Sequence, residues 1–239
     1  MKNKGIQVIN NKIKLKYKND NRGKFIILSS TMKERNKIKI IIDNKEIKSN
    51  KYECEKSEIE VELLIKDKIK NFSHMFDECD LYDVEELKYL DVSNGNTFNS
   101  MFNHCKQLQN INGLRNWKVS NGNNFSQMFY GYNQLQNIDG LSNWNVSNGN
   151  YFSFMFNSCN KLQNIDVLSN WNVSNGNDFS YMFFDCNLQN IDVLSNWNVS
   201  NGNNFSSMFY NCYQLHNIDL FKKSLFYKTC KNIDQLEIE

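Results

Sequence analysis

Cysteine, histidine and aspartate are the residues of this chain that could do chemistry, and five of the cysteines share one spacing. They recur every 26 or 27 residues once Tyr132 is counted in the place of a missing one, and they are Cys79, Cys105, Cys159, Cys186 and Cys212. A zinc site needs ligands paired at short spacing, as in C-x-x-C, and the chain has no such pair. We therefore expect buried free thiols that fill the core, with no metal and no cofactor.

The histidines do not indicate a catalytic site. His74, His104 and His216 occupy unrelated places in the sequence pattern, so no Ser, His and Asp set can be proposed from spacing. The chain also lacks a phosphate-binding loop, a dinucleotide-binding fingerprint and a His-Glu-x-x-His motif. We expect a protein that is not an enzyme.

The cysteines belong to a longer repeat of 26 or 27 residues, which is the strongest pattern in the sequence. Each unit opens with a phrase close to Phe-Ser-x-Met-Phe. The opening residues are Phe72, Phe98, Phe125, Phe152, Phe179 and Phe205. Apolar residues at offsets of 0, 3, 4 and 7 from that Phe are typical of one helix face. The pattern predicts a short helix, capped by the Asn or Asp before the Phe, as at Asn124.

The second half of each unit has a different rhythm. Residues 162–167 place apolar side chains at positions 1, 4 and 6, and residues 168–173 repeat that spacing around Trp171. This predicts two very short strands, and the closing Ser-Asn-Gly-Asn predicts a turn whose glycine has a positive φ. Elements this short bury their apolar sides only against copies of themselves. We expect six units stacked into an α/β repeat solenoid with one continuous core.

One complete unit, LSNWNVSNGNNFSSMFYNCYQLHNIDL, resembles the repeat of the BspA-like leucine-rich-repeat proteins, a family of surface proteins. The shared signature is Leu-Ser-x-Trp, then Met-Phe-x-x-Cys, then Leu-x-x-Leu-x-Leu, and the resemblance covers about residues 71–220. It implies a leucine-rich-repeat-like solenoid and a role in adhesion or protein binding. The turn here departs from that family in lacking a valine, and the N-terminal sequence lacks the continuous apolar run of a secretion signal.

Polar residues beside the repeated isoleucines are the candidate partner-binding residues. If the isoleucines point inward, their neighbours line the surface of the predicted strands. These neighbours are Asn112, Asp139, Asp166, Asp192 and Asp219, with Asn137, Asn164 and Asn190 on the other flank. Carboxylates in a row repel one another, which favours a protein partner with a basic surface. A solvated polar edge explains the same pattern, and both interpretations stay open at this point.

The first 70 residues differ from the rest in charge and in pattern. Residues 1–70 hold 19 basic and 10 acidic side chains, whereas residues 71–239 hold 9 and 16. Charged and apolar residues alternate at 12–18, 37–42 and 57–65, which predicts strands. A fourth strand is expected at 25–28 and a short helix at 30–36. We expect residues 1–70 to form a β-rich N-terminal cap domain, 71–220 the solenoid, and 221–239 a C-terminal cap.

These features favour a non-enzymatic module whose ligand is another protein. The lysines alternate with apolar residues, as on the solvated face of strands, so we expect no nucleic-acid partner. No stretch is long enough for a membrane span. We expect a monomer that is cytoplasmic, as the N-terminal sequence indicates, or displayed at the cell surface, as the resemblance implies. A surface adhesin and a self-assembling structural protein are the alternatives.

Overall fold

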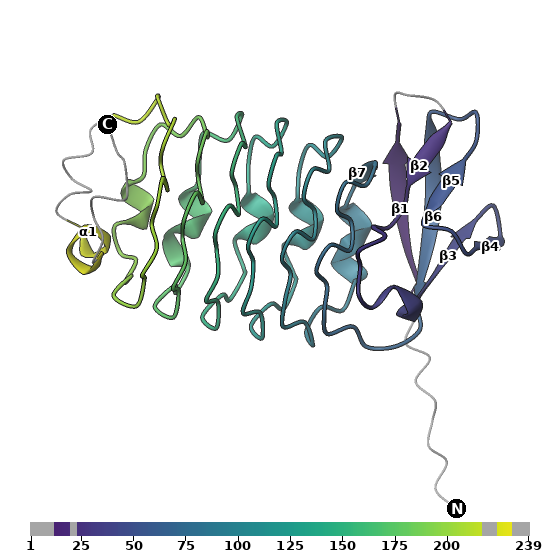
Figure 1. The fold of residues 1–239 in the computed structure, drawn as a ribbon, viewed down its shortest axis with the longest axis horizontal. Coiled ribbons are helices and arrows are strands. Elements are labelled where there is room, and N and C mark those ends of the chain that lie inside the picture. The colour runs from purple at the N-terminus through teal and green to yellow at the C-terminus, as the bar shows by residue number, and fades with distance from the viewer. Residues whose placement is uncertain (1–11, 20–22, 217–223, 231–239) are drawn as a thin grey trace, which may run out of the picture.

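The computed structural model describes residues 12–19, 23–216 and 224–230. An antiparallel sheet region lies at one end, stacked repeat coils form the body, and a short helix lies at the other end (Figure 1). The predicted arrangement of a solenoid-like body behind a β-rich N-terminal region is confirmed at this level. The local structure within each repeat differs from the prediction.

The N-terminal region contains two antiparallel sheets. The larger has the strand order β4-β3-β6-β1-β7, and the smaller pairs β2 with β5. The strands are β1 (Lys12–Lys18), β2 (Lys24–Ile26), β3 (Ile38–Ile42), β4 (Lys45–Ile47), β5 (Lys51–Glu53), β6 (Glu58–Ile65) and β7 (Leu81–Asp83). Strand β7 comes after the first Phe phrase and pairs with β1, so backbone hydrogen bonds join the sheet to the first repeat.

Alternation of charged and apolar residues produces the two central strands. In β1 and β6 all the apolar side chains except Leu64 are buried and most of the charged ones face solvent, because successive side chains of a strand point to opposite faces. Across the pair, Lys12 Nζ lies 2.7 Å from Glu62 Oε1 and Lys14 Nζ lies 3.0 Å from Glu60 Oε1. The solvated face of the sheet is therefore covered with paired opposite charges.

Most strand predictions for this region are confirmed. The strands expected at 12–18, 37–42 and 57–65 match β1, β3 and β6 to within a residue, and the one at 25–28 is the shorter β2. The helix predicted at 30–36 is wrong. That segment forms turns followed by a 3-10 helix, η1 (Arg35–Lys37), which is held by local hydrogen bonds.

The Phe phrases fold as pairs of β-turns, so the helices predicted there are wrong. In the first repeat the Met75 N–H donates to the Phe72 carbonyl, and the Cys79 N–H donates to the Phe76 carbonyl. The third residue of each four-residue turn alone has a positive φ, which is the signature of a type II turn. Through the six repeats these residues are His74, Glu78, Ser100, His104, Gln127, Gly131, Phe154, Ser158, Tyr181, Asp185, Ser207 and Asn211.

The phrases form turns and not helices because the backbone of each phrase is hydrogen-bonded to the next repeat. The N–H groups of Phe72, His74, Phe76 and Glu78 donate to carbonyls of the next repeat at 2.8–3.0 Å. An isolated helix of about eight residues has a costly nucleus and few internal hydrogen bonds, whereas this ladder satisfies the backbone at every junction. The 0, 3, 4, 7 spacing fits both structures, because it also marks the first and last residues of two consecutive turns.

The isoleucine segments lead into 3-10 helices where strands were predicted. These helices are η2 (Glu85–Tyr89), η3 (Asn112–Leu114), η4 (Asp139–Leu141), η5 (Asp166–Asn170) and η6 (Asp192–Leu194). The side chain two residues upstream accepts the first N–H; it is Asp83 for η2 and an asparagine for the others, as Asn164 Oδ1 accepts from Asp166 at 2.7 Å. This Asx turn bends the chain where a strand would need to run straight. Parallel bridges instead join the residues before successive phenylalanines, as Asn124 joins Tyr151.

The core consists of ring columns that run through all the repeats. Successive opening phenylalanines stack with centroids 5.3–5.7 Å apart, and the second Phe of each phrase forms a parallel column at 5.5–5.8 Å. The tryptophans are buried beside them, and Trp117 stacks on Trp144 at 6.1 Å. Each indole N–H donates to the preceding repeat, as Trp144 Nε1 does to the Leu114 carbonyl at 2.9 Å. The expected shared interior is present.

The glycine of each Ser-Asn-Gly-Asn turn is needed for space. Gly122 does not have the positive φ that the sequence predicted, and a Cβ added to it would collide with the ring of Phe125. At the far end of the body, Phe226 of α1 (Leu225–Thr229) packs 6.3 Å from Trp197 and 5.9 Å from Phe205. The predicted C-terminal cap lies partly outside the described residues, and its described part covers the last rings.

Candidate partner-binding surface

We name the positions two and five residues after each opening Phe the turn face; most of these residues are at least partly exposed, whereas Ser100 and Asn157 are buried. These positions hold His74, Asp77, Ser100, Asn103, Gln127, Tyr130, Phe154, Asn157, Tyr181, Phe184, Ser207 and Tyr210. Because the core is built from the first and last residues of the turns, residue type at the turn face is free to vary from repeat to repeat. The first two repeats differ there from the last four.

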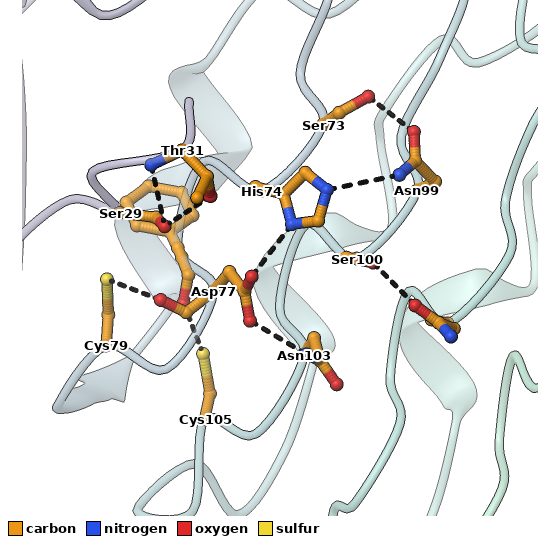
Figure 2. Close-up of polar contacts among 12 residues, drawn as sticks. Ser29, Thr31, Ser73, His74, Asp77, Cys79, Asn99, Ser100, Asn103 and Cys105 are labelled. Atoms are coloured by element: carbon orange, nitrogen blue, oxygen red, sulfur yellow. Dashed lines mark hydrogen bonds and ion pairs between the residues drawn. The ribbon is translucent and has the colours of Figure 1, made fainter. Parts of the chain in front are cut away.

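In repeats 1 and 2 the turn face carries a polar network (Figure 2). His74 Nδ1 lies 2.8 Å from Asp77 Oδ2, and Asn103 Nδ2 donates to Asp77 Oδ1 at 2.8 Å. The other imidazole nitrogen lies 3.5 Å from Asn99 Nδ2. Asn99 Oδ1 in turn accepts from the Ser73 hydroxyl at 2.5 Å. These bonds join the side chains of the two repeats, and among them only the Asn103 Oδ1 atom is buried without a hydrogen-bond partner.

The fold brings His74 and Asp77 together although sequence spacing did not indicate it. This pair is not arranged as a base with a nucleophile, because the Ser73 hydroxyl bonds to Asn99 and the second imidazole nitrogen faces an amide. The Asp77 side chain is 14% exposed and the His74 side chain 34%. Their contact is therefore part of a hydrogen-bond network within the first two repeats.

In repeats 3 to 6 the turn face carries exposed or half-buried rings, which we name the aromatic ridge: Tyr130, Phe154, Tyr181, Phe184 and Tyr210. Phe154 stacks on Tyr181 at 4.6 Å, and Phe184 stacks on Tyr210 at 5.4 Å. Tyr181 and Phe184 lie 5.7 Å apart, which connects the two stacks. Tyr210 is 45% exposed and the other four are partly exposed. The ridge is one continuous apolar row along the body.

The fold does not require these rings. At the position of Tyr181 other repeats hold Ser100, Gln127 and Ser207, and at the position of Phe184 other repeats hold Asn103 and Asn157. Those repeats form the same paired turns with the same positive φ values. The rings therefore occupy positions where other repeats of the same fold hold small polar residues.

The residue composition around the ridge is similar to the composition typical of protein interfaces. The four phrases at 124–132, 151–159, 178–186 and 204–212 contain no Lys, Arg or Glu, and their only charged residues are Asp178 and Asp185. They are rich in Tyr, Phe, Ser and Asn. Protein interfaces are enriched in aromatic residues and depleted in Lys and Glu, and binding loops combine rigid Tyr anchors with adaptable Ser and Asn.

The candidate residues predicted from the sequence lie on a different surface, at the starts of the 3-10 helices. Asn112, Asp139 and Asp166 are exposed and Asp192 is partly exposed, whereas Asp219 lies outside the described residues. Asp139, Asp166 and Asp192 form no ion pair with any described residue; the side chains of Asn137, Asn164 and Asn190 accept their backbone N–H groups. The asparagines thus have a structural role, and the three carboxylates remain available as an acidic row.

A third surface is an open groove of about 540 Å³ lined by the asparagines of the Ser-Asn-Gly-Asn turns. Asn148 Nδ2 donates to the Ser120 carbonyl at 2.7 Å, and Asn150 Nδ2 donates to the Asn175 carbonyl at 2.9 Å. Equivalent bonds recur at the neighbouring junctions, for example from Asn175 to Ser147 at 2.7 Å. These asparagines recur in the sequence because they fasten each repeat to its neighbours.

The cysteine column is part of the core. The thiol of Cys105 donates to the Phe76 carbonyl at 2.9 Å, and that of Cys186 donates to the Phe156 carbonyl at 3.1 Å. Burial raises the pKa of both thiols. All seven cysteines are free, and no group of three His, Cys, Asp or Glu side chains in the described ranges is placed to hold a metal ion.

Sequence reasoning missed the aromatic ridge. The repeat pattern is defined by residues that recur in every unit, and the ridge consists of residues that do not recur. The signal that could have found it is the pair of columns at offsets 2 and 5, where rings alternate with Ser, Gln and Asn. A position that varies among repeats of one fold is a position that the fold leaves open.

The fold is a repeat solenoid that follows an antiparallel sheet region in the chain. The chain belongs to the family described as Mycoplasma protein of unknown function, DUF285, whose model matches residues 45–165 and 133–235. The two tandem matches follow from the repeats. Comparisons with curated proteins and with solved structures found no match. In the part of the chain that the structure describes, none of the helices has the length and hydrophobicity needed to cross a bilayer.

Proposed function

We propose that this chain is a non-enzymatic repeat module that binds another protein through the aromatic ridge. The observation that carries the proposal is the contrast within one column, where Tyr181 stands in a position that Ser207 fills equally well for folding. Rings that are exposed on a rigid body stabilise a complex when a partner covers them, because their apolar surface is removed from water.

Rigidity supports this role. The ridge side chains stand on turns whose backbone is bonded to both neighbouring repeats, as when Tyr181 N–H donates to the Ser206 carbonyl at 2.9 Å. Little conformational entropy remains to be lost when such a surface binds. Tyr and Phe also have few rotatable bonds, so each ring adds contact area at low entropic cost.

The acidic row supports a partner with a basic surface. Asp139, Asp166 and Asp192 lie on successive repeats with no positive partner among the described residues. Between residues 124 and 216 the chain has five aspartates and one basic residue, Lys161. Such a field steers a basic protein toward the body and increases its association rate.

The finer assignment as a BspA-like leucine-rich-repeat adhesin belongs to this proposal. Its support is the shared order of Trp, Met-Phe, Cys and leucine positions, and display at the cell surface is the location that this resemblance favours. For the self-assembling alternative, end-to-end stacking would need an open core at the last repeat. Phe226 lies over Trp197 there, which favours a monomer.

A pull-down from lysate of the source cells tests the proposal with three immobilised proteins. They are the wild type, a ridge variant (Tyr181→Ser with Phe184→Asn) and an acidic-row variant (Asp139→Asn, Asp166→Asn and Asp192→Asn). We expect a protein retained by the wild type and lost from the ridge variant. Equal retention by the ridge variant would contradict the proposal that the ridge binds the partner. Loss of the partner from the acidic-row variant alone would show that the acidic row is the binding surface.

A further inference from the structure

We propose that a cavity at the junction of the N-terminal region and the first two repeats binds a small zwitterion, a molecule that carries both an ammonium group and a carboxylate. Free amino acids and short peptides with free ends have this chemistry. The cavity has a volume of about 650 Å³, which lies within the range of roughly 300–1,000 Å³ that is usual for ligand sites. Its residues lie outside the aromatic ridge, so this proposal is independent of the proposed function.

The side chains that line the cavity break the repeat at two positions. The positions six and eight residues after the opening Phe hold Glu78 and Asp80 in repeat 1, and His104 and Lys106 in repeat 2. In repeats 3 to 5 the same positions hold smaller side chains, which are Gly131, Asn133, Ser158, Asn160, Asp185 and Asn187. The paired turns form with these smaller residues too, so the repeat itself does not require the long charged side chains of repeats 1 and 2.

The two repeats present opposite charges to the cavity without pairing them. Repeat 1 contributes the carboxylates of Glu78 and Asp80, and repeat 2 contributes the ammonium group of Lys106. None of these three side chains forms an ion pair with a residue that the structure describes. A ligand that brings an ammonium group to the carboxylates and a carboxylate to Lys106 would pair all three through charge-assisted hydrogen bonds.

Asp80 joins the cavity to the N-terminal region. Its Oδ2 atom accepts from the Ile26 N–H at 2.8 Å, and the Asn19 side chain also bonds to it. Burial raises the pKa of the Asp80 carboxyl, and these two hydrogen bonds oppose that rise. Both hydrogen-bond partners are neutral, so a partly buried carboxylate is left without a counter-charge. A cationic group that enters the cavity would stabilise its charged form.

The backbone holds the cavity residues in place before a ligand binds. The Glu78 N–H donates to the Asn103 carbonyl at 2.8 Å, and the His104 N–H donates to the Tyr130 carbonyl at 2.9 Å. The His104 ring meets the Tyr130 ring edge-on with centroids 4.9 Å apart, and a Cβ added to Gly131 would collide with the imidazole. Gly131 therefore leaves room for this ring. A site fixed in this way loses little conformational entropy on binding.

Ligands with a single sign of charge fit this cavity less well. A simple anion such as phosphate would be repelled by two carboxylates, and a simple amine would leave Lys106 without a partner. A divalent cation needs several ligands around one point, and no group of three His, Cys, Asp or Glu side chains among the described residues is placed to provide them. The partly buried Ile26 adds an apolar wall, which suits a zwitterion with an apolar side chain.

Calorimetric titration of the full chain with five probes tests the proposal. The probes are the peptide Ala-Leu-Ala with free ends, the same peptide acetylated at its N-terminus, amidated at its C-terminus or blocked at both ends, and free leucine. We expect the peptide with free ends to bind, each singly blocked peptide to bind about tenfold more weakly, and the doubly blocked peptide not to bind. Equal binding of free leucine would identify amino acids as the ligands, and binding of the peptide alone would identify short peptides.

Protein variants show whether binding takes place in the cavity. Glu78→Gln and Lys106→Gln each remove one exposed charge and keep the shape of the side chain, so both proteins should fold, and each should bind the free-ended peptide about tenfold more weakly. Glu55→Gln and Lys161→Gln remove the same charges at exposed positions outside the cavity and should bind it like the wild type.

Three results would overturn the proposal: equal binding of the doubly blocked peptide, unchanged binding by both cavity variants, or no binding of any probe at millimolar concentration. The ridge variant Tyr181→Ser with Phe184→Asn should bind the free-ended peptide like the wild type. Failure of this proposal therefore leaves the proposed function of the ridge unaffected, and failure of the ridge pull-down leaves this proposal unaffected.

Discussion

The turn face of repeats 1 and 2 and that of repeats 3 to 6 share one backbone and differ in what their side chains do. In the first part, His74, Asp77 and Asn103 bond to one another. In the second part, Tyr181 and Tyr210 occupy the corresponding positions and leave rings and hydroxyls at the surface. One region uses these positions mainly for hydrogen bonds between side chains, whereas the other fills them mainly with rings that stack on one another and stay partly exposed.

This difference separates the residues that fold the chain from the residues that could act. Inner positions hold the same residue types in nearly every repeat, with Tyr132 in place of a cysteine as one exception, because each ring packs against its counterpart above and below. Outer positions vary because no neighbouring side chain determines them. In a repeat protein, functional residues are therefore to be sought among the residues that break the repeat.

The largest expected effect comes from the core that both regions share. Phe98→Ala in the polar part and Phe179→Ala in the aromatic part each remove a buried ring stacked on two others. We expect each to lower the free energy of unfolding by about 3–5 kcal/mol, measured by urea denaturation followed by circular dichroism. A cost below about 1 kcal/mol at only one of them would mean that the two regions do not share a continuous core.

A smaller effect is expected from the polar network. Asp77→Ala removes the acceptor of His74 and of Asn103, which leaves a partly buried imidazole and amide without that partner. We expect a loss of about 1–2 kcal/mol, compared in the same denaturation assay with Tyr181→Ser in the aromatic part, which should cost about 1 kcal/mol. A larger loss from Tyr181→Ser would show that the ridge also serves folding.

The asparagine bonds between repeats should contribute equally in the two regions. Asn121→Ala removes a donor to the Ser93 carbonyl at 2.8 Å, and Asn175→Ala removes a donor to the Ser147 carbonyl at 2.7 Å. Both sites are exposed, so water replaces part of each bond, and we expect about 0.5–1 kcal/mol for either variant. Thermal unfolding checks this, with exposed Asn143→Ala as the matched control.

No difference between the regions is expected in thiol reactivity. Burial raises the pKa of Cys212 to about 12. At pH 8 on the order of one such thiol in 10,000 is therefore ionised. Burial raises the pKa values of the other column cysteines too, which makes them unreactive toward alkylating reagents. Because the raised pKa favours the neutral thiol, labelling should increase as the pH rises toward 12. Iodoacetamide with mass spectrometry should modify half-buried Cys54 in the native protein and the column only after denaturation. Fast native labelling of Cys105 would contradict the buried column.

Much of the architecture could be predicted from the sequence. The 26- or 27-residue period required stacking, and alternation of lysine or glutamate with isoleucine, leucine and valine required the strands at 12–18 and 57–65. The local structure of the repeat could not be predicted, because apolar offsets of 0, 3, 4 and 7 suit a helix face as well as two consecutive turns. Only the bonds to the next repeat decide between them, and those bonds are not local in sequence.

The candidate site was predicted less well, for a related reason. Asp139, Asp166 and Asp192 do lie at the surface, but on 3-10 helices, because Asn137, Asn164 and Asn190 bend the chain. His74 pairs with Asp77 from a turn position with a positive φ, and its residue type does not predict that conformation. In the sequence, the ridge residues differ only in varying from repeat to repeat. The structure shows that the rings at offsets 2 and 5 form one row, because the paired turns place these two positions near each other.

The measurement that most directly tests the central claim combines stability and binding in one variant, Tyr181→Ser with Phe184→Asn. These substitutions place residues from other repeats into the ridge, so the claim predicts thermal unfolding within a few degrees of wild type and loss of the partner retained in the pull-down. A variant that unfolds far below the wild type while any folded fraction still retains the partner would contradict the account, because the rings would then serve the fold and not the partner.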